Sequence, residues 1–272
     1  IFKNMNVDLT ELFCDVDGTF PNHHPDPTVE ANLTDLISLM KTGKFDIGIA
    51  FDGDADRIGV VDETGDIIWA DQLMALFLPE VLEEGDEILY DVKCSQALEK
   101  MIVKYGGKPI MWKTGHSLIK QRMGELNCKL GGEMSGHIFF ADDYYGYDDA
   151  IYVAARIVQT LSRTDKTLSQ LKAELPTYFS TPEMRLEAES DEEKFRIVKE
   201  AVAYFTDNYD CSTIDGVRIQ FGDGWGLVRQ SNTQPVIVCR FEANTPERMA
   251  EIQSIVLDKL QTIGSLKLDA GH

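Results

Sequence analysis

Strand patterns and helix patterns alternate through the middle of this sequence, and this alternation constrains the fold more than any other feature. Short apolar runs end in polar loops, and each loop precedes a segment with helical periodicity and a capping residue. Such an alternation is typical of α/β domains, in which helices cover a sheet. The predicted elements are a strand over 87–92, a helix from the N-cap Ser95 to Tyr105, a strand over 109–113 and a helix capped by Ser117.

The residues before this region predict a strand hairpin and a helix. Hydrophobic residues alternate over 45–51, and 58–62 is the predicted return strand. Asp71 is the predicted N-cap of a helix that runs to Leu82. Further along the chain, apolar residues at helical spacing predict another helix over 148–161.

The pattern changes at about residue 182. The predicted elements are a strand over 184–188, a helix capped by Ser190 to about 205, strands over 217–221, 225–228 and 236–241, and a helix to 263 with Thr245 as cap and Pro246 as first residue. Strands in sequence with a helix on either side indicate a small α+β domain. The changes of pattern predict domain boundaries near 65 and 178, and thus segments 1–65, 66–178 and 179–272.

Charge and hydropathy exclude two classes of protein. The 272 residues carry a formal net charge of −20, whereas a nucleic-acid binder needs Lys and Arg to replace the counterions around phosphates. The same charge argues against docking on an anionic membrane, and no run of 18 apolar residues predicts a membrane span. With 43% hydrophobic and 26% charged residues, the composition is that of a globular chain.

The cysteines and the first residues bear on the compartment and on the length of the protein. Five scattered cysteines, none in a CxxC pair, predict neither a disulfide framework nor a cysteine zinc site and favour a reducing cytoplasm. They are Cys14, Cys94, Cys128, Cys211 and Cys239. The sequence begins at Ile1 without an initiator Met or a signal-peptide pattern. We therefore expect a piece of a longer cytoplasmic protein.

An acidic loop directly after the predicted strand 45–51 is the strongest chemical feature. Asp52, Asp54 and Asp56 repel one another unless a cation lies among them. Oxygen ligands suit Mg²⁺ or Ca²⁺, and Mg²⁺ is favoured where a phosphate completes the shell. An EF-hand loop would need Gly where Arg57 stands and helices on both sides, so we reject it. A solvated acidic turn remains the alternative.

A second acidic motif, Asp-x-Asp-Gly-Thr over 15–19, follows an apolar segment. It matches the nucleophile signature of haloacid-dehalogenase-type phosphatases, in which the first Asp attacks phosphorus. Here the motif continues into a Pro- and His-rich loop instead of a helix. We therefore expect a non-catalytic turn, and a phosphatase built on Asp15 and Asp17 is kept as an alternative.

A glycine-rich loop over 131–137 carries one acid, one hydroxyl and one imidazole. Glu133 accepts hydrogen bonds, while Ser135 both donates and accepts, which suits the hydroxyls of a sugar. His137 completes the set. The alternative is a glycine turn with a satisfied histidine.

Two predicted strands end at basic residues. Lys93 follows the strand 87–92, and Thr114-Gly115-His116 follows Lys113 and opens the next helix. Exposed N–H groups and the helix dipole favour an anion at such a helix start. For either lysine alone, a surface charge is an equal alternative.

The connection over 226–235 contains one guanidinium, two hydroxyls and amide side chains such as that of Asn232. Together with backbone N–H groups, Arg229, Ser231, Asn232 and Thr233 would cradle a phosphate. In a chain of charge −20, such a cradle is where a phosphate could bind. A hairpin connection without function is the alternative.

In their order along the chain, the DGDxDR, KTGHS, GEMSGH and RxSNTxP loops resemble those of the α-D-phosphohexomutase superfamily. The similarity is greatest to its bacterial phosphomannomutase/phosphoglucomutase branch and extends from Phe13 to the last helix. The resemblance implies four domains around one cleft, each with one loop in it. Segments 1–65 and 66–178 would be the end of the second and the whole third domain, which are α/β domains with mixed sheets. Segment 179–272 would be a TATA-binding-protein-like α+β domain.

The resemblance also implies a reaction. A phosphoserine would give its phosphate to mannose or glucose 1- or 6-phosphate, and the 1,6-bisphosphate of glucose or mannose would turn round and return the other phosphate. One Mg²⁺ would be held by Asp52, Asp54 and Asp56. The residues implied as catalytic are Arg57, Lys93, His116 and His137, with His137 as general acid/base. Those implied for substrate binding are Thr114, Gly115, Glu133, Ser135, Arg229, Ser231, Asn232 and Thr233.

One motif of the family is missing. No T-x-S-H-N-type sequence occurs here, so the phosphoserine would belong to an N-terminal domain outside this sequence. That domain and phosphohexose substrates are the expected partners, and the chain alone is expected to lack mutase activity. The alternatives are a phosphoglucosamine mutase, the dehalogenase-type phosphatase and a non-catalytic sugar-phosphate-binding module.

Overall fold

The computed structural model describes residues 1–231 and 235–268 and divides into two compact units. Unit 1 comprises residues 1–90, 98–110 and 116–175. Unit 2 comprises residues 91–97 and 111–115 together with the C-terminal part from residue 176. The second unit therefore combines two short segments from the middle of the chain with its last third.

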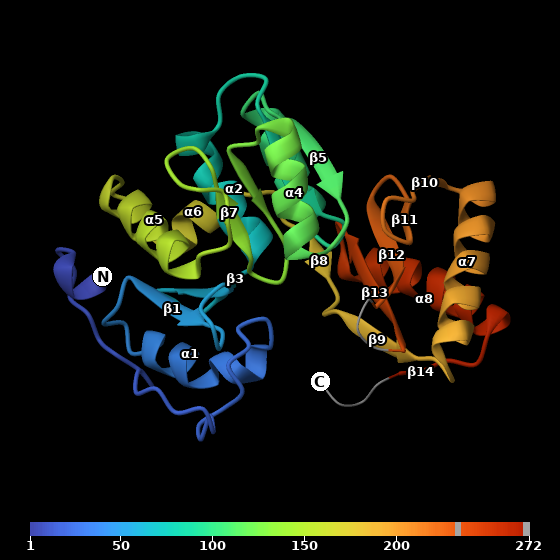
Figure 1. Ribbon diagram of the computed structural model, residues 1–272, viewed down its shortest axis with the longest axis horizontal. Coiled ribbons are helices and arrows are strands. Elements are labelled where there is room, and N and C mark those ends of the chain that lie inside the picture. Colours follow the sequence, from blue (N-terminus) through green and yellow to red (C-terminus); the bar gives the residue numbers. More distant parts are fainter. Residues whose placement is uncertain (232–234, 269–272) are drawn as a thin grey trace. The chain divides into compact units, whose positions relative to one another are not determined.

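A small antiparallel sheet in unit 1 supports the acidic loop (Figure 1). Its order is β1-β2-β3, with Phe51 paired to Ile58 across the loop, and helix α1 packs against β1. The bounds are α1 Thr34–Met40, β1 Ile47–Phe51, β2 Ile58–Asp62 and β3 Ile67–Ile68, with short 3-10 helices at Phe2–Asn4 and Glu30–Leu33. The predicted hairpin is confirmed, and α1 was not predicted.

A second sheet has the order β5-β4-β6-β7 and is mixed. Strand β4 is parallel to β6, and β6 is antiparallel to β7. The expected α/β fold with mixed sheets is therefore confirmed. The strands are β4 Glu87–Asp91, β5 Lys108–Trp112, β6 Leu130–Gly132 and β7 Ile138–Phe140. The helices are α2 Ala70–Val81, α3 Gln96–Lys104, α4 His116–Leu126, α5 Ala150–Ser162 and α6 Leu168–Lys172.

Helix starts test the predicted caps. The Ser95 hydroxyl accepts a hydrogen bond from the Ala97 N–H at 3.0 Å, which confirms this cap. The prediction for Asp71 was wrong, because α2 begins one residue earlier and has Trp69 as its N-cap. The prediction of Ser117 as an N-cap was also wrong, because α4 already begins at His116. Both misplaced residues lie in the first turn, where short polar side chains are tolerated as well as at the cap itself.

Unit 2 is built on an antiparallel sheet of order β10-β11-β12-β13-β9-β14, and β8 also pairs with β13. The strands are β8 Phe179–Ser180, β9 Met184–Glu187, β10 Asp210–Ser212, β11 Val217–Gln220, β12 Gly224–Gln230, β13 Val236–Ala243 and β14 Lys267–Leu268. Helices α7 (Asp191–Asn208) and α8 (Pro246–Ile263) begin at the predicted caps, since the Ser190 and Thr245 side chains accept hydrogen bonds from the N–H groups of Glu193 and Arg248.

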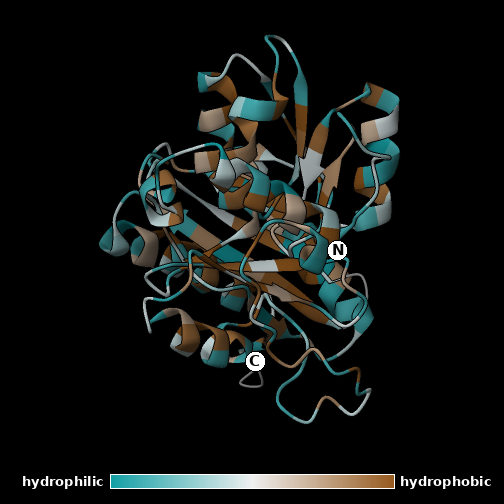
Figure 2. Cartoon of the chain, turned by 90° about the vertical axis from the view of Figure 1, so that its left-hand side faces the viewer, coloured by the Kyte–Doolittle hydropathy of each residue, from teal (hydrophilic) through white to brown (hydrophobic). Residues whose placement is uncertain are grey.

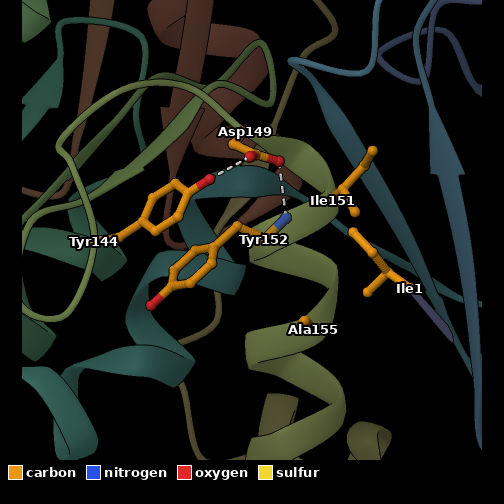
Figure 3. A pocket seen from close by; sticks show the side chains of 6 residues that line it. All are labelled: Ile1, Tyr144, Asp149, Ile151, Tyr152 and Ala155. Atoms are coloured by element: carbon orange, nitrogen blue, oxygen red, sulfur yellow. Dashed lines mark hydrogen bonds between the residues drawn. The ribbon is translucent and has the colours of Figure 1, made fainter. Parts of the chain in front are cut away.

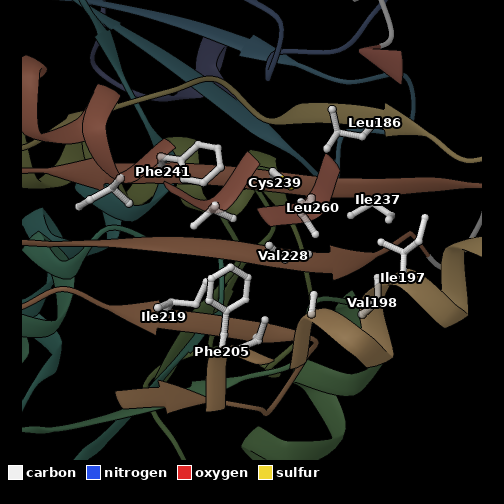
Figure 4. Close-up of a cluster of buried hydrophobic side chains, with 14 of the residues drawn as sticks. Leu186, Ile197, Val198, Phe205, Ile219, Val228, Ile237, Cys239, Phe241 and Leu260 are labelled. Carbon is white, nitrogen blue, oxygen red and sulfur yellow. The ribbon is translucent and has the colours of Figure 1, made fainter. Parts of the chain in front are cut away.

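Alternation along the strands of unit 2 separates two faces. On one face, side chains such as Ile219, Val228 and Phe241 form a buried core with α7 and α8 (Figure 4). On the other face, the intervening positions hold charged and aromatic residues that are also buried. They are Arg218, Trp225, Arg229, Arg240 and Glu242. Helices cover the first face, and the second face is where polar chemistry concentrates.

The helices carry both hydrophobic and hydrophilic residues along their length (Figure 2). This is the distribution of amphipathic helices that cover a core on one side and meet water on the other. Among the described residues, no helix is long and apolar enough to cross a membrane.

Candidate active site

The acidic loop over 52–57 connects β1 to β2 and is shaped by its own backbone. The Asp52 N–H donates to the Arg57 carbonyl at 3.2 Å, and the Ala55 N–H donates to the Asp52 carbonyl at 3.3 Å. Ala55 has φ of 60°, a left-handed conformation that is uncommon for a residue with a side chain. Its carbonyl accepts from the Ala150 N–H at 3.1 Å, so the start of α5 helps to hold the loop.

Asp52 is bound on both carboxylate oxygens. Its Oδ1 accepts from the N–H groups of Asp56 and Arg57 at 3.1 and 3.0 Å, and its Oδ2 accepts from Arg57 Nε at 2.7 Å. Burial alone would raise the pKa of Asp52, but the hydrogen bonds and the charge of Arg57 outweigh it and lower the pKa. Asp52 therefore stays ionised, and Arg57 is fixed beside it.

The three aspartates of the loop form a compact oxygen donor set. One carboxylate oxygen each from Asp52, Asp54 and Asp56 lies within 4.8 Å of the other two. The pKa of Asp56 is raised, mainly by burial. The charge of His137 lowers this pKa, whereas the charges of Asp52 and Asp54 raise it further. A raised carboxylate pKa beside like charges is what a cation would relieve.

The glycine-rich loop connects β6 to β7 as a tight hairpin, an arrangement that the sequence patterns did not reveal. The Glu133 N–H donates to the His137 carbonyl at 2.8 Å, and the Gly136 N–H donates to the Glu133 carbonyl at 3.1 Å. Gly136 has φ of 104°, and a Cβ there would lie 2.8 Å from the Ile58 carbonyl oxygen. Glycine is required here because the loop lies directly against the start of β2.

His137 lies among three polar side chains. Its Nδ1 is 3.1 Å from Glu133 Oε2 and 3.0 Å from Ser135 Oγ, and its Nε2 is 3.3 Å from Asp56 Oδ1. Burial lowers the pKa of His137, but the hydrogen bond and charge of Glu133 and the charge of Asp56 more than compensate, so the net pKa is raised. The predicted sugar loop and the predicted metal loop thus meet at one imidazole.

His116 stacks on His137, with ring centroids 5.4 Å apart and an interplanar angle of 22°. Its Nδ1 is 3.0 Å from Asp148 Oδ2, while Lys120 Nζ is 2.8 Å from Asp148 Oδ1. The sequence analysis missed Asp148 and Lys120. Lys120 does stand one helical turn after His116, which is the one signal that could have linked the two.

In unit 2, two aspartates connect three of the predicted site residues through hydrogen bonds and an ion pair. Arg229 Nε donates to Asp215 Oδ2 at 2.9 Å, and the Thr114 N–H donates to the same oxygen at 3.2 Å. The Thr114 hydroxyl donates to Asp91 Oδ2 at 2.9 Å, and Lys93 Nζ lies 4.0 Å from that oxygen. Asp215 and Asp91, neither of which was predicted, therefore hold predicted residues in place.

Lys93 has a second acidic neighbour. Its Nζ lies 3.2 Å from Glu183 Oε2, and Arg185 NH2 lies 3.2 Å from Glu183 Oε1. Burial would raise the pKa of Glu183, but Lys93, then Arg185 and Arg229, lower it by their positive charge. Glu183 was also missed, because it belongs to no motif of the sequence.

The segment that carries Lys93 is held by buried side chains of the C-terminal sheet. Arg218 NH1 donates to the carbonyls of Val92 and Cys94 at 2.7 and 2.9 Å, and Arg240 NH1 donates to the Lys93 carbonyl. The Arg218 guanidinium lies 3.8 Å from the ring centroid of Trp225. We call Arg218, Arg240 and Trp225 the arginine clamp.

The predicted phosphate loop is described only in part. Arg229 lies within strand β12 and not in the connection, because β12 continues to Gln230. The Ser231 N–H donates to the Val236 carbonyl at 2.9 Å, and Lys194 Nζ donates to the Ser231 carbonyl at 3.1 Å. Asn232 and Thr233 lie outside the described residues.

The dehalogenase-type alternative requires a buried strand before Asp15. Residues 12–14 form no strand, and both Asp15 and Asp17 are exposed. Asp17 Oδ1 accepts from the N–H and hydroxyl of Thr19 at 2.9 and 2.7 Å, which closes a local turn. A nucleophile in such an enzyme would have to follow a buried strand, and no strand precedes Asp15 among the described residues, so the structure does not support this alternative.

An apolar pocket of about 300 Å³ lies elsewhere in unit 1 (Figure 3). Tyr144 and Tyr152 stack there at 3.9 Å between centroids, and Asp149 accepts hydrogen bonds from the Tyr144 hydroxyl and the Tyr152 N–H. None of the residues predicted for binding or catalysis lines this pocket. The candidate site is therefore the polar clusters and not this pocket.

Three domain models of one family match consecutive parts of the chain. Models of phosphoglucomutase/phosphomannomutase domain II, domain III and the C-terminal domain match residues 1–65, 69–179 and 183–259. A phosphomannomutase/phosphoglucomutase of Pseudomonas putida is 47% identical over 96% of this chain, and a phosphoglucomutase of Neisseria meningitidis is 45% identical over 93%.

A solved structure of a family protein from Burkholderia thailandensis has a TM-score of 0.87 and 43% identity over 95% of this chain. The chain spans 57% of the Pseudomonas putida protein, 56% of the Neisseria protein and 56% of the Burkholderia chain. Three consecutive domain models, the identities and the shared fold lead to one conclusion. The chain belongs to the phosphoglucomutase/phosphomannomutase family.

Proposed function

We propose that this chain is the part of a phosphohexomutase that holds the metal ion, the sugar and the phosphate that is not transferred. The observation that carries the proposal is His137, which lies between Asp56 of the acidic loop and Glu133 of the glycine-rich loop. One imidazole thus joins carboxylates suited to a metal with groups suited to sugar hydroxyls. In this proposal, segments 1–65, 66–178 and 179–272 correspond to the end of domain II, to domain III and to domain IV.

The acidic loop fits Mg²⁺ by the chemistry of its donors. Asp52, Asp54 and Asp56 offer only carboxylate oxygens, which are the protein ligands that Mg²⁺ prefers, and these oxygens lie close together. Arg57 adds a fixed positive charge beside them. When bound, Mg²⁺ would neutralise charge on a phosphoryl group during its transfer.

Sugar recognition is assigned to Glu133 and Ser135, whose oxygens flank His137. His137 would act as general acid/base, because an imidazole can both donate and accept a proton, and the nearby carboxylates raise its pKa and so favour its protonated form. It would take the proton of the attacking sugar hydroxyl. His116, stacked on His137, and Lys93 would also contact the substrate.

The phosphate that is not transferred would bind to Arg229, Ser231, Thr114 and Gly115. A guanidinium forms strong charge-assisted hydrogen bonds with phosphate oxygens, and backbone N–H groups add to them. The bond from Arg229 Nε to Asp215 fixes the orientation of the guanidinium. Asn232 and Thr233 complete the proposed set.

The proposed reaction moves a phosphoryl group between the 1- and 6-oxygens of glucose or mannose. A phosphoserine outside this sequence gives its phosphate to the hexose monophosphate, and the 1,6-bisphosphate then turns round and returns its other phosphate to the serine. Each transfer breaks one P–O bond and forms another, so no further reactant is needed. The chain alone would bind phosphohexoses without interconverting them.

Calorimetric titration with glucose 1-phosphate and mannose 1-phosphate in the presence of Mg²⁺ tests the binding part. We expect both to bind and Arg229→Ala to weaken binding by about 10- to 100-fold, the loss of one or two charge-assisted hydrogen bonds. Arg196→Ala is the matched control, because Arg196 pairs with Glu193 and Glu200 on helix α7. Equal affinity of Arg229→Ala and the unsubstituted chain would contradict the phosphate site.

Turnover tests the catalytic part. In a longer protein that carries this chain and the phosphoserine segment, His137→Gln should lower kcat by about 10²- to 10⁴-fold, the usual contribution of a general acid/base. The chain by itself should show no turnover. Turnover by the isolated chain at the rate of the longer protein would overturn the proposal.

A further inference from the structure

Four side chains of unit 1 gather a mixed set of nitrogen and oxygen donors. His116, His137, Asp56 and Asp148 each place one potential ligand atom within 4.8 Å of the other three. They come from the start of α4, the glycine-rich loop, the acidic loop and the residue two positions before α5. Only Asp56 is shared with the three-aspartate set, so this is a different group of ligands with a different chemistry.

The spacing approaches that of a tetrahedral metal site. His116 Nδ1 lies 3.0 Å from Asp148 Oδ2, and His137 Nε2 lies 3.3 Å from Asp56 Oδ1. Bonds of about 2.0 Å in a tetrahedron separate neighbouring ligand atoms by about 3.3 Å. Two edges therefore already have the required length. The stacked imidazoles bring the two pairs together, with ring centroids 5.4 Å apart.

Outer hydrogen bonds orient the ligands as they do in metal sites. Glu133 Oε2 and Ser135 Oγ lie at His137 Nδ1, which leaves Nε2 turned to Asp56. A carboxylate behind the second ring nitrogen is the usual partner of a metal-bound histidine. Lys120 holds Asp148 Oδ1 at 2.8 Å and thereby directs Oδ2 to His116.

We propose that these four residues bind Zn²⁺ or a chemically similar divalent transition metal. Imidazole nitrogens favour such ions over Mg²⁺, whereas the all-carboxylate loop favours Mg²⁺. Two carboxylates also balance the charge of a divalent ion. The inference concerns the chain's own side chains and does not depend on the proposed mutase activity.

Co²⁺ is the probe, because four-coordinate Co²⁺ with nitrogen ligands absorbs visible light much more strongly than six-coordinate Co²⁺ on oxygen ligands. We expect the metal-free chain to develop the intense four-coordinate spectrum with one equivalent of Co²⁺ and to lose it when Zn²⁺ is added. His116→Gln and Asp148→Asn should each weaken Co²⁺ binding by more than about 10-fold, since even outer partners of a metal ligand contribute 10- to 100-fold.

Two controls separate this site from other metal ligands. Asp54→Asn removes a donor of the acidic loop only, and His24→Gln removes an exposed histidine outside the cluster. Both should keep the four-coordinate spectrum. His116 is 51% exposed, so His116→Gln should fold normally, and circular dichroism checks this. The proposal is wrong if no four-coordinate spectrum develops, if it survives both His116→Gln and Asp148→Asn, or if Asp54→Asn alone abolishes it.

Discussion

Glu183 is a carboxylate that stays ionised in a half-buried position because three cationic side chains act on it. Burial by itself would raise the pKa of Glu183. Lys93 opposes this by charge and by a hydrogen bond, and Arg185 and Arg229 add their charges, so the pKa is lowered. The charge of Glu183 therefore contributes to stability above its unfolded pKa of about 4.3. That contribution is lost as pH falls through the lower pKa of the folded state.

Lys93→Met should make unit 2 less stable at neutral pH and its stability less dependent on pH in acid. Without the ammonium group, the pKa of Glu183 is lowered less, so the Glu183 charge contributes less stability at neutral pH and less of it is lost in acid. Urea unfolding measured between pH 7 and pH 3 should show that the free energy of unfolding of the variant is lower at pH 7 and falls less as the pH is lowered. Lys44→Met, at an exposed position, is the control. Parallel pH profiles for Lys93→Met and the parent chain would refute the coupling.

Thiol chemistry should distinguish the cysteines by burial. Cys14 is exposed, whereas burial raises the pKa of Cys128 to about 11 and also raises that of Cys239. With a chromogenic disulfide reagent at pH 8, we expect one fast thiol that Cys14→Ser removes. Cys128 and Cys239 should react only when urea unfolds the chain. Fast reaction of the Cys14→Ser variant at either buried thiol would contradict the described packing.

The candidate ligands could be predicted from the sequence, but the residues that orient them could not. Asp52, Glu133 and Arg229 stand in motifs whose composition indicates chemistry. Asp148 and Asp215 stand in no such motif, and each acquires its role from a partner 32 and 14 residues away along the chain, His116 and Arg229. A single sequence contains no signal for such a pair, because folding alone brings the two side chains together.

Long helices and strands, and those whose start is indicated by neighbouring residues, were the easiest to predict from the sequence. The starts of helices α7 and α8 could be predicted from the capping residues Ser190 and Thr245, because a cap and the first helical turn are neighbours in sequence. Strands of two or three residues, such as β6, β8 and β10, are too short to show an alternation. Their pairing with longer strands creates them, which is why the hairpin around the glycine-rich loop was not predicted.

The turn between β10 and β11 allows a test of how tightly a turn packs against a neighbouring strand. Gly216 has φ of 71°, and a Cβ there would lie 2.2 Å from the Val228 carbonyl oxygen, whereas a Cβ at Gly222, with φ of 83°, would meet nothing within 4 Å. Gly222→Ala should cost about 1–2 kcal/mol from backbone strain alone. Gly216→Ala should cost more, because strand β12 must move.

Urea unfolding of both variants gives the comparison. Displacement of β12 at Val228 would also disturb Arg229 and its bond to Asp215, so Gly216→Ala should bind hexose phosphate more weakly than Gly222→Ala. Equal stability of the two variants would show that the turn does not press on β12.

At the scale of the molecule, unit 2 is not continuous in sequence. Changes of pattern indicate a boundary near residue 178, yet residues 91–97 and 111–115 pack with the C-terminal part. The arginine clamp explains why, since Arg218 and Arg240 donate to the carbonyls of 92–94. Sequence patterns mark boundaries between consecutive segments of a chain, but they cannot show that a short segment packs with residues far away in the sequence.

A fragment of residues 176–272 should therefore fold less stably than the same residues in the whole chain. Trp225 is the single tryptophan of this fragment and is fully buried in the chain, where it packs with Val92. Without residues 91–97, we expect its fluorescence emission to shift to longer wavelength and its urea midpoint to fall. The chain with Trp69→Phe and Trp112→Phe is the reference with one tryptophan. Identical emission in fragment and reference would contradict the prediction.

The arginine clamp has a consequence for synthesis on the ribosome. Residues 92–94 are made before Arg240, which donates to the Lys93 carbonyl and follows it 147 residues later. At about 5–20 residues per second, this interval lasts about 7–30 s. During that time the segment that carries Lys93 lacks its hydrogen bond from Arg240. This part of the candidate site therefore cannot be completed before Arg240 has been translated.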